Sequence, residues 1–380
     1  MAEKRNMIRV VMVIQEYHPI IGGAERQLAS QAALLKNKGL DIHVVTRRWP
    51  GLSPFEVING IPVYRMLSWG PRPIAAILFI ITAVWKLYWL KPDIIHAFEL
   101  LSPSTISVLS KWLLHRPLIV KILRGGVLGD LTKIGSGLFG KLRIRFVLNA
   151  VDVFVVISNE INDELRTFGV EAERRIFIPN GVDTTRFTPA DPLIKDTLRI
   201  KLGLPDGLLT IFTGRLEIEK RLDLLIFIWA KIRRHIPNAY LLLVGIGSQE
   251  AYLRSIAGEG VIFVGEVEDT APYLIASDIF VLPSISEGLS NSLLEALSCE
   301  LAVIATSIGG TTDVVVNNVN GLLVNNESPE ELMSGLMRLL NDSDFRRRIG
   351  VAGRQTILEK YSMLRVVTAI RNLYSVLLSK

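Results

Sequence analysis

Short apolar runs rich in β-branched residues alternate with longer helical patterns along nearly the whole chain, and this alternation restricts the fold more than any other feature. Continuous apolar strands separated by helices are typical of parallel sheets that helices cover on both faces. We therefore predict an α/β fold. The expected strands are IRVVMVI from residue 8, DIHVVT from 41, DIIHAF from 93, LIVKIL from 118, VFVVIS from 153, LTIFTG from 209, AYLLLVG from 239, VIFVG from 261, IFVLP from 279, AVIAT from 302 and GLLV from 321.

These runs form two consecutive series within 380 residues, which predicts two doubly wound, Rossmann-like domains. The turn-rich stretch IPNGVDTTRFTPADP, from Ile178, supplies a boundary, so we expect domains at residues 1–183 and 184–361. Residues 362–380 form an amphipathic helical pattern with no strand after it, and we expect this helix to pack back on the N-terminal domain. Ligands of such sheets bind beyond the carboxyl ends of the strands, which places the expected site in a cleft between the domains.

The composition, with 49% hydrophobic and 21% charged residues, fits a globular protein with large cores. The single cysteine, Cys299, excludes an internal disulfide and fits a reducing compartment. The first apolar run, MIRVVMVI from Met7, is short and lacks a small-residue cleavage site, so it indicates a buried strand and not a secretion signal. We therefore expect a cytoplasmic protein.

The run IAAILFIITAVWKLYWL, residues 74–90, contains Lys86 and is slightly shorter than a bilayer span requires, which favours a buried or interfacial helix over a transmembrane one. Residues 1–185 contain 23 Lys and Arg against 15 Asp and Glu, whereas residues 186–380 contain 20 against 22. A basic half with apolar helices suggests contact with an anionic membrane, on its inner face, or with an anionic acceptor. A solvated basic face is the alternative, and no nucleic-acid-binding motif accompanies the charge.

The stretch EGLSNSLLEALS places Glu287 and Glu295 eight residues apart. Ser292 and Glu295 have capping-box spacing, so Glu287 is expected in a loop after a strand and Glu295 inside the next helix. The backbone N–H groups between them are of the kind that bind an anion. Alternatively, acidic residues near a helix start only complement the helix dipole.

The stretch TGRLEIEKRLDLLI, from Thr213, places Arg215 and Lys220 around an expected helix start, where a diphosphate would meet two cations. Two glycine-containing turns follow other strands: Gly22 and Gly23 in IIGGAERQL, and Gly245 in GIGSQE. Glycine allows the backbone to approach a ligand closely, but neither of these two stretches contains a complete GxGxxG fingerprint, and tight-turn geometry explains the same residues. Alternatively, Arg215 and Lys220 are solvent-exposed basic residues of a loop and bind no diphosphate.

Other reaction classes find little support in the sequence. The five histidines show neither an HExxH motif nor a metal-ligand spacing, and the chain has no GxSxG nucleophile elbow and no Walker loop. A covalent hydrolase or a metal enzyme is therefore not expected.

Together these motifs resemble those of the retaining nucleotide-sugar glycosyltransferases of family 4, whose two Rossmann-like domains form the GT-B fold. The resemblance covers nearly the whole chain, and the E-x7-E pattern from Glu287 to Glu295 is its most specific part. The other matching stretches, in the order of the family, are YHPIIGGAERQL, PDIIHAF, DVFVVISN, IPNGVDTTRFTP, FTGRLEIEKRLDLLI, VGIGSQE, APYLIASDIFVLPSISEGLSNSLLEALSC and ATSIGGTTDVV.

The resemblance implies that the N-terminal domain binds the acceptor and the C-terminal domain the donor. Glu287 would orient the donor sugar, Glu295 would hold the ribose, and Arg215 and Lys220 would hold the diphosphate in place of a metal, so no cofactor or divalent ion is expected. Glu287, Arg215 and Lys220 are thus the expected catalytic residues. The expected donor-binding residues are Gly22, Gly23, Gly288, Leu289, Ser290, Asn291, Glu295, Gly245 and Val267.

One position departs from the family pattern. Many relatives have a histidine after the strand that here reads LIVKIL, whereas this chain has Arg124, and neither Lys121 nor Asp130 restores a histidine. Arg124 would contact the donor phosphate or an anionic acceptor, or the site has a different geometry. His96, which we expect at another strand end, is more typical of a structural histidine.

The resemblance implies transfer of a sugar from a UDP- or GDP-linked donor to a glycan or lipid-linked acceptor, in the synthesis of cell-surface polysaccharide or glycolipid. A nucleotide-sugar epimerase on the same fold and a catalytically silent nucleotide-sugar-binding subunit are the alternatives. An epimerase would need no acceptor, which the apolar helices disfavour, and the presence of all four matched donor-site side chains disfavours a silent subunit.

Overall fold

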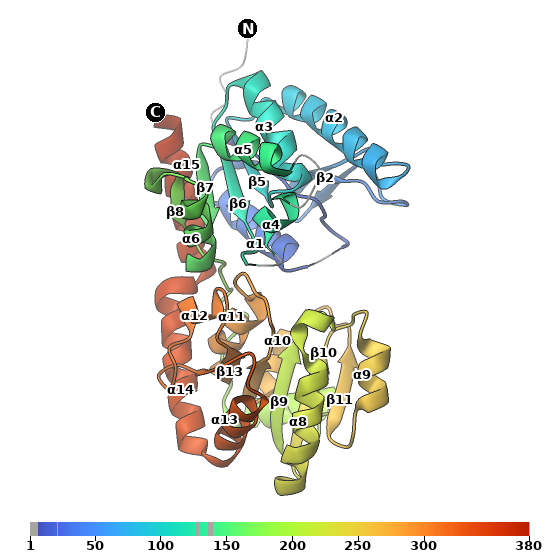
Figure 1. Ribbon diagram of the computed structural model, residues 1–380, viewed down its shortest axis with the longest axis vertical. Coiled ribbons are helices and arrows are strands. Elements are labelled where there is room, and N and C mark those ends of the chain that lie inside the picture. Colours follow the sequence, from blue (N-terminus) through green and yellow to red (C-terminus); the bar gives the residue numbers. More distant parts are fainter. Residues whose placement is uncertain (1–6, 21, 127–128, 136–139, 380) are drawn as a thin grey trace. The chain divides into compact units, whose positions relative to one another are not determined.

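A computed structural model describes residues 7–20, 22–126, 129–135 and 140–379 (Figure 1). The chain divides into two compact units. Unit 1 contains residues 1–180 together with 363–380, and unit 2 contains residues 181–362. The observed division after Asn180 lies close to the boundary that we expected after residue 183.

Unit 1 is built on an eight-stranded sheet in the order β3-β4-β2-β1-β5-β6-β7-β8. Its pairs are parallel, except that the edge strand β3, which the apolar runs did not predict, pairs antiparallel with β4. The apolar-run pattern does not detect β3, β4 or β8, because β3 is largely exposed, β4 alternates buried and half-buried residues, and β8 has three residues. The strands are β1 (Arg9–Val13), β2 (Asp41–Arg47), β3 (Phe55–Ile58), β4 (Ile61–Met66), β5 (Ile94–Phe98), β6 (Leu118–Ile122), β7 (Val153–Val156) and β8 (Arg175–Phe177).

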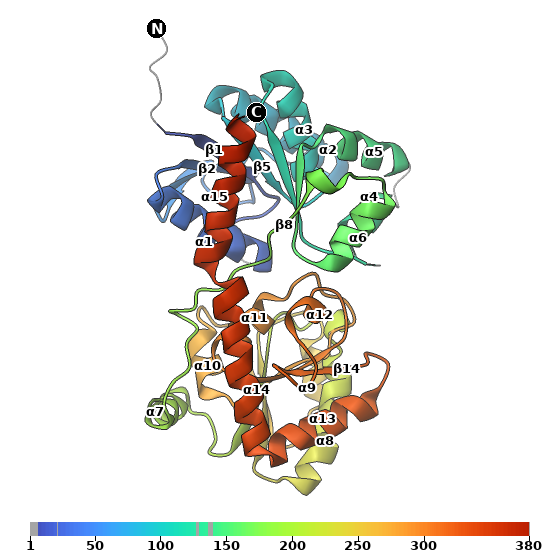
Figure 2. The same cartoon turned by 90° about the vertical axis from the view of Figure 1, so that its left-hand side faces the viewer.

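Helices lie on both faces of this sheet, as the doubly wound prediction requires (Figure 1). The C-terminal helix α15 packs beside α1, and Figure 2 shows the two helices next to each other on one side of the sheet. Val366, Val367 and Ile370 of α15 belong to the same buried core as Leu28 of α1 and Val10 of β1. The expected packing of the last helix on the N-terminal domain is therefore confirmed. The helices are α1 (Gly23–Asn37), α2 (Arg72–Leu90), α3 (Ser102–Leu114), α4 (Asp130–Gly135), α5 (Gly140–Ala150), α6 (Asn159–Thr167) and α15 (Met363–Ser379).

Within the described residues, α2 is the one helix long and apolar enough to cross a membrane, by length and composition alone. Only 28% of its most apolar 18-residue window is buried. Its inward side chains, among them Phe79 and Leu87, are buried in unit 1, while Trp85 and Trp89 on the opposite side are 62% and 61% exposed. The helix is thus buried along one side and open to its surroundings along the other.

Unit 2 is built on a six-stranded sheet in the order β11-β10-β9-β12-β13-β14, and all its pairs are parallel. All the expected strands of this half are present. They are β9 (Leu208–Thr213), β10 (Ala239–Val244), β11 (Val261–Gly265), β12 (Ile279–Leu282), β13 (Ala302–Thr306) and β14 (Leu322–Val324). The helices are α7 (Pro192–Leu202), α8 (Leu222–His235), α9 (Glu250–Ile256), α10 (Ala271–Ala276), α11 (Asn291–Ser298), α12 (Thr311–Val314), α13 (Pro329–Asn341) and α14 (Ser343–Thr356).

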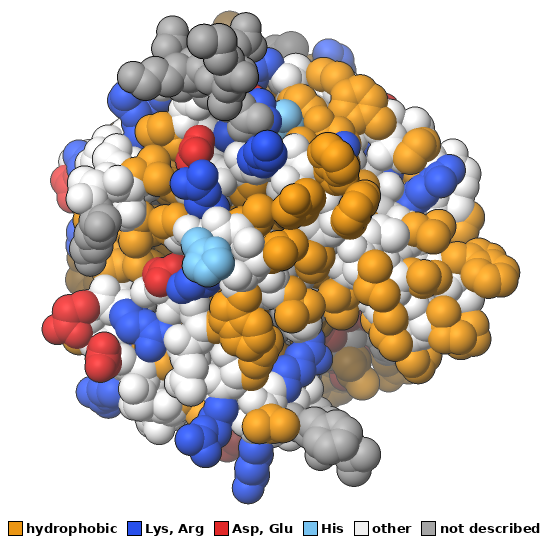
Figure 3. Space-filling view, turned by 90° about the horizontal axis from the view of Figure 1, so that it is seen from above, with side chains coloured by type: hydrophobic (Ala, Val, Ile, Leu, Met, Phe, Trp, Pro, Cys, Tyr) orange, Lys and Arg blue, Asp and Glu red, His pale blue; other side chains and the backbone are white. Residues whose placement is uncertain are grey.

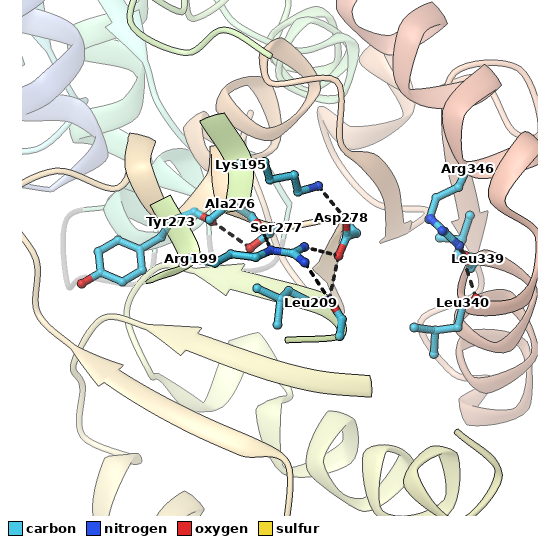
Figure 4. A network of polar contacts seen from close by, with 11 residues as sticks. Lys195, Arg199, Leu209, Tyr273, Ala276, Ser277, Asp278, Leu339, Leu340 and Arg346 are labelled. Atoms are coloured by element: carbon cyan, nitrogen blue, oxygen red, sulfur yellow. Dashed lines mark hydrogen bonds and ion pairs between the residues drawn. The ribbon is translucent and has the colours of Figure 1, made fainter. Parts of the chain in front are cut away.

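A charged network joins α7 to the start of the unit 2 sheet (Figure 4). The Asp278 carboxylate, just before β12, accepts hydrogen bonds from Lys195 at 2.6 Å and Arg199 at 2.8 Å. It also accepts one from the backbone N–H of Leu209 in β9 at 2.8 Å. Because all these partners surround one carboxylate, the network holds α7 against two central strands that pair with each other.

Candidate active site

The loops after β9, β10, β12 and β13 of unit 2 are bonded to one another at the carboxyl edge of the sheet. The Leu216 N–H donates to the Ile246 carbonyl at 2.9 Å, which joins the loops after β9 and β10. The Ile285 N–H donates to the Glu219 carbonyl at 2.9 Å, which joins the loops after β12 and β9. The candidate site of unit 2 therefore has a backbone framework of its own at the edge where parallel sheets bind ligands.

Lys220 and Glu287 meet within this framework. The Lys220 Nζ atom lies 2.6 Å from Glu287 Oε1, and both side chains are nearly buried, at 13% and 11% exposure. The Ser284 hydroxyl donates to the same carboxylate oxygen at 2.7 Å, and the Thr306 hydroxyl donates to the Ser284 carbonyl at 2.5 Å. Glu287 is thus held by a cation and a hydroxyl. Ser284 and Thr306 were not among the expected site residues, because their place in the site depends on the neighbouring strand β13.

The stretch between the two glutamates forms the loop and helix that we expected. Glu287 lies in the loop after β12, and Glu295 lies inside α11. The expected N-cap is wrong: Ser290 and not Ser292 caps α11, because its hydroxyl accepts the Leu293 N–H at 3.3 Å. Ser292 instead lies inside the first turn, with its hydroxyl 3.0 Å from that of Ser290. Three other residues of the stretch also have interaction partners, namely Leu289, Asn291 and Glu295.

Gly288 and Gly310 form a close backbone contact that the motifs did not predict. The Gly310 N–H donates to the Gly288 carbonyl at 2.7 Å. A Cβ atom at position 310 would lie 2.1 Å from that carbonyl oxygen, so a side chain cannot be placed there without movement of the loop. The pair of glycines in SIGG is the signal that could have pointed to this contact.

Arg215 is exposed in the loop after β9, near the carboxylate of Glu217. Hydrogen bonds from the Ser248 hydroxyl, at 2.6 Å, and from its N–H lower the pKa of Glu217. Gly245 follows β10 with a φ of +133°, and a Cβ atom there would lie 2.0 Å from the Gly214 carbonyl oxygen. The geometry of a tight turn is therefore enough to explain the glycine at position 245. Val267, another expected donor-binding residue, lies half-buried in the loop after β11.

At the carboxyl edge of the unit 1 sheet, Gly22 and Gly23 begin α1 as expected. The Gly22 N–H donates to the Glu25 carboxylate at 2.8 Å, and a Cβ atom at position 22 would lie 2.7 Å from that oxygen. Gly23 and Glu25 have further partners. Ile21, in the same glycine stretch, lies outside the described residues.

Arg124 lies half-buried just after β6, at the same edge. Its carbonyl accepts the Asp130 N–H at 3.0 Å, which joins the residue after β6 to the first residue of α4. A Cβ atom at the following Gly125 would lie 2.8 Å from a carboxylate oxygen of Glu160, so a side chain there would require that carboxylate to move. Burial raises the pKa of the Asp130 carboxyl, although Lys133 and Arg124 oppose that rise.

Glu99 is a further candidate that was not among the expected site residues. It follows β5 directly and adopts a φ of +79°, which is rare for a residue other than glycine. Burial, together with the carboxylates of Asp130, Glu25 and Glu16, raises the pKa of Glu99 to about 8. A carboxyl group directly after the run DIIHAF, at a strand end, is the signal in the sequence that could have identified it.

His96 does not lie at a strand end as we expected but in the middle of β5, fully buried. Its Nδ1 atom lies 2.7 Å from the Tyr374 hydroxyl of α15. Burial and the neighbouring Lys121 lower the pKa of His96 to about 3, and burial lowers that of Lys121 to about 7. The imidazole is therefore neutral at physiological pH and joins the C-terminal helix to the sheet, away from the strand-end loops.

Within the described ranges, the side chains include no group of three or more His, Cys, Asp or Glu residues that could hold a metal ion. Arg215 and Lys220 are basic side chains of the loop after β9 in unit 2.

Comparison with known proteins agrees with this architecture. Two doubly wound domains with polar loops at their strand ends are the fold of GT-B glycosyltransferases. The family model "Glycosyltransferase Family 4" matches residues 21–186, and the model "Glycosyl transferases group 1" matches residues 208–342. The chain therefore belongs to family 4 of the glycosyltransferases and is a glycosyltransferase.

The matches to individual relatives cover different shares of the chain. An uncharacterised glycosyltransferase of Methanocaldococcus jannaschii is 28% identical over 97% of this chain and 98% of its own. A GDP-mannose-dependent monoacylated alpha-(1-6)-phosphatidylinositol monomannoside mannosyltransferase of Corynebacterium glutamicum is 36% identical, but the match spans only 58% of this chain and 61% of that protein. The Anabaena protein HepE, solved with UDP-glucose, has the same fold, with a TM-score of 0.81, 19% identity, and coverage of 97% of this chain and 99% of HepE.

Proposed function

We propose that this protein is a retaining glycosyltransferase that moves a sugar from a UDP- or GDP-linked donor to a glycan or lipid-linked acceptor. The Lys220–Glu287 pair at the strand-end loops of unit 2 is the observation that carries the proposal. A nucleotide-sugar donor is further supported by two of the similar proteins, one named for GDP-mannose and one solved with UDP-glucose. In this proposal unit 2 binds the donor and unit 1 the acceptor.

The chemistry requires stabilisation of a leaving group. When the bond between sugar and diphosphate breaks, the sugar becomes oxocarbenium-like and negative charge grows on the diphosphate. Exposed Arg215 and the Lys220 ammonium supply fixed positive charge for that diphosphate, and the start of α11 supplies backbone N–H groups. Glu287, held by Lys220 and Ser284, would then orient the hydroxyls of the sugar, and Glu295 the ribose.

Retention of configuration would follow from attack on the same face that the diphosphate leaves, with a donor phosphate oxygen taking the acceptor proton. This route needs no protein base at the donor site. Because two side-chain cations serve the diphosphate, we propose that catalysis is independent of divalent metal. We further propose that the protein works in the cytoplasm, at the inner face of the membrane, in the synthesis of cell-surface polysaccharide or glycolipid.

Calorimetric titration of UDP and GDP, with magnesium and with EDTA, tests the donor site. We expect one nucleotide to bind with equal affinity under both conditions, and Arg215→Ala to weaken it about tenfold or more, since a charge-assisted contact to phosphate is lost. Arg254→Ala, which removes an exposed arginine paired with Glu250 on α9, is the matched control. Binding that requires magnesium, or equal affinity in Arg215→Ala, would contradict the proposed diphosphate site.

Turnover separates the transferase from its two alternatives. Release of the nucleotide from a sugar donor, measured with a candidate acceptor, should fall at least about 100-fold in Glu287→Gln, while nucleotide binding is retained. An epimerase would convert the donor sugar without any acceptor. A silent subunit would bind the nucleotide and show no turnover in the wild type.

A further inference from the structure

The outward side of α2 is the largest concentration of exposed apolar side chains on one helix of unit 1. We call the α2 face the surface formed by Ile74, Ile77, Ile81, Trp85, Tyr88 and Trp89, each between 42% and 62% exposed. Their spacing of three or four residues, with Tyr88 and Trp89 adjacent at the end, places them along one side of the helix. Figure 3 shows apolar side chains gathered on the side of the view where α2 lies.

The inner side of the same helix fixes how α2 can meet a partner. Phe79 and Leu87 are buried in unit 1, at 1% and 0% exposure. If α2 left the domain to span a bilayer, these side chains would leave cavities in the core, which are costly. The helix therefore stays along the surface, and its exposed strip from Ile74 to Trp89 is roughly 22 Å long.

The aromatic residues of the α2 face form a cluster at the C-terminal end of the helix. The ring centroids of Trp85 and Trp89 are 5.8 Å apart, and those of Trp85 and Tyr88 are 6.1 Å apart. On the next helix, α3, Trp112 is 55% exposed and packs edge-on against Phe146 of α5. Tryptophan and tyrosine rings are favoured at the level of lipid headgroups, where one part of the ring is apolar and another can donate a hydrogen bond.

The segment of chain that forms the α2 face has charge of a single sign. The sequence from Leu67 to Pro92 contains no Asp or Glu, while Arg72 and Lys91 are exposed at the two ends of α2. Such cations complement anionic headgroups. A second copy of the chain would bring the same cations towards each other across a twofold axis, so the charge disfavours self-association on this face.

We propose that the α2 face docks on an anionic phospholipid bilayer, with α2 parallel to the membrane plane and Trp85 and Trp89 at the level of the headgroups. This inference deepens the proposed function, since it rests on an acceptor that is carried by a membrane. It also identifies which helix of unit 1 makes the contact and why that helix does not span the bilayer.

Flotation of the full chain with vesicles tests the proposal. Phosphatidylcholine vesicles with and without phosphatidylglycerol are compared, for the wild type and for Trp85→Ser/Trp89→Ser. We expect binding to the anionic vesicles that falls about tenfold or more in this variant, because its apolar contact is removed. Arg72→Glu/Lys91→Glu should weaken binding to anionic vesicles only, and more so at low salt. Phe227→Ser/Tyr252→Ser, which removes two exposed aromatic rings of unit 2, is the control and should bind like the wild type.

Calorimetry of UDP and GDP on the same variants separates this inference from the proposed function, since nucleotide binding at unit 2 should be unchanged. The inference is overturned if the wild type binds neither type of vesicle, or if the tryptophan variant binds as tightly as the wild type. It is also overturned if sedimentation shows a dimer that the tryptophan variant dissociates, because the α2 face would then be an interface between two copies.

Discussion

Glu99 combines two unusual properties at the carboxyl end of β5: a positive φ and a carboxyl group whose pKa is raised to about 8. Backbone conformations of this kind persist only where the surroundings impose them, and they concentrate at functional sites. Glu287 has different surroundings, because its carboxylate contacts the Lys220 ammonium at 2.6 Å and the Ser284 hydroxyl at 2.7 Å. At the scale of single residues, the strand-end loops of the two units therefore place carboxyl groups in different surroundings: Glu99 lies near other carboxylates, whereas Glu287 contacts a cation and a hydroxyl.

We predict that Glu99 makes stability depend on pH. Because its folded pKa is above the unfolded value of about 4.3, the folded state keeps a proton that the unfolded state releases between about pH 4 and pH 8. Stability should thus fall as the pH rises through this window and level off above it. Glu99→Gln should remove that dependence. Compared with the wild type, the variant should therefore gain on the order of 2 kcal/mol in free energy of unfolding as the pH rises from 4 to 9. This gain is less than the full linkage value because Glu99 is partly exposed.

Urea unfolding of both proteins at a series of pH values measures this difference. Glu171→Gln, at an exposed position of the same unit, is the control and should follow the wild type. A Glu99→Gln curve parallel to that of the wild type across the whole window would show that the carboxyl titrates alike in the folded and unfolded states.

At the scale of elements, α15 is a helix from the end of the sequence that completes the core of unit 1. It contributes apolar side chains and one polar contact, between the Tyr374 hydroxyl and His96 Nδ1 at 2.7 Å. Both side chains are fully or almost fully buried. Such a contact favours one position of the helix, because burying a polar atom without a hydrogen-bond partner costs more free energy than burying an apolar atom.

Tyr374→Phe should lower the free energy of unfolding by about 1–3 kcal/mol, since it leaves the buried imidazole nitrogen without its partner. Tyr88→Phe, which removes the hydroxyl of a tyrosine that is 42% exposed on α2 in the same unit, is the matched control and should have almost no effect. Chemical unfolding that follows the fluorescence of unit 1 gives both values. An equal effect of the two substitutions would contradict the role that we assign to the contact.

At the scale of the whole molecule, the two units differ in how their sequences are arranged. Unit 2 is one continuous segment, residues 181–362, whereas unit 1 is interrupted and needs residues 363–380 to cover its core. Val366, Val367, Ile370, Tyr374 and Leu377 are all buried there. Burying five such side chains contributes about 10 kcal/mol, which is as large as the net stability of a typical domain.

A chain that ends at Ser362 should therefore lose the folded structure of unit 1 and keep that of unit 2. Limited proteolysis with mass spectrometry should show rapid cleavage within residues 1–180 and a protected fragment from 181–362, which still binds the nucleotide in calorimetry. A chain that lacks only residues 379–380 controls for the change of terminus. Equal protection of residues 1–180 in the two truncated chains would contradict this dependence on α15.

The local sequence pattern predicts much of this architecture. Buried parallel strands are continuous apolar runs, so all eleven that we expected are present, and the loop after IFVL and the helix containing Glu295 follow from the same local rules. The half-exposed strands β3 and β4 and the three-residue β8 lack such a run, and Ser290 caps α11 where spacing alone favoured Ser292.

Contacts between distant segments depend on the tertiary structure and were not predicted from the sequence. The pairing of Lys220 with Glu287, the support from Thr306, and the contact between His96 and Tyr374 join residues far apart in the chain. The sheet order places these segments side by side, and burial lowers the pKa of His96. Local propensity acts over a few residues and therefore fixes helices and strands, whereas charge pairing and desolvation depend on which elements the tertiary fold brings together.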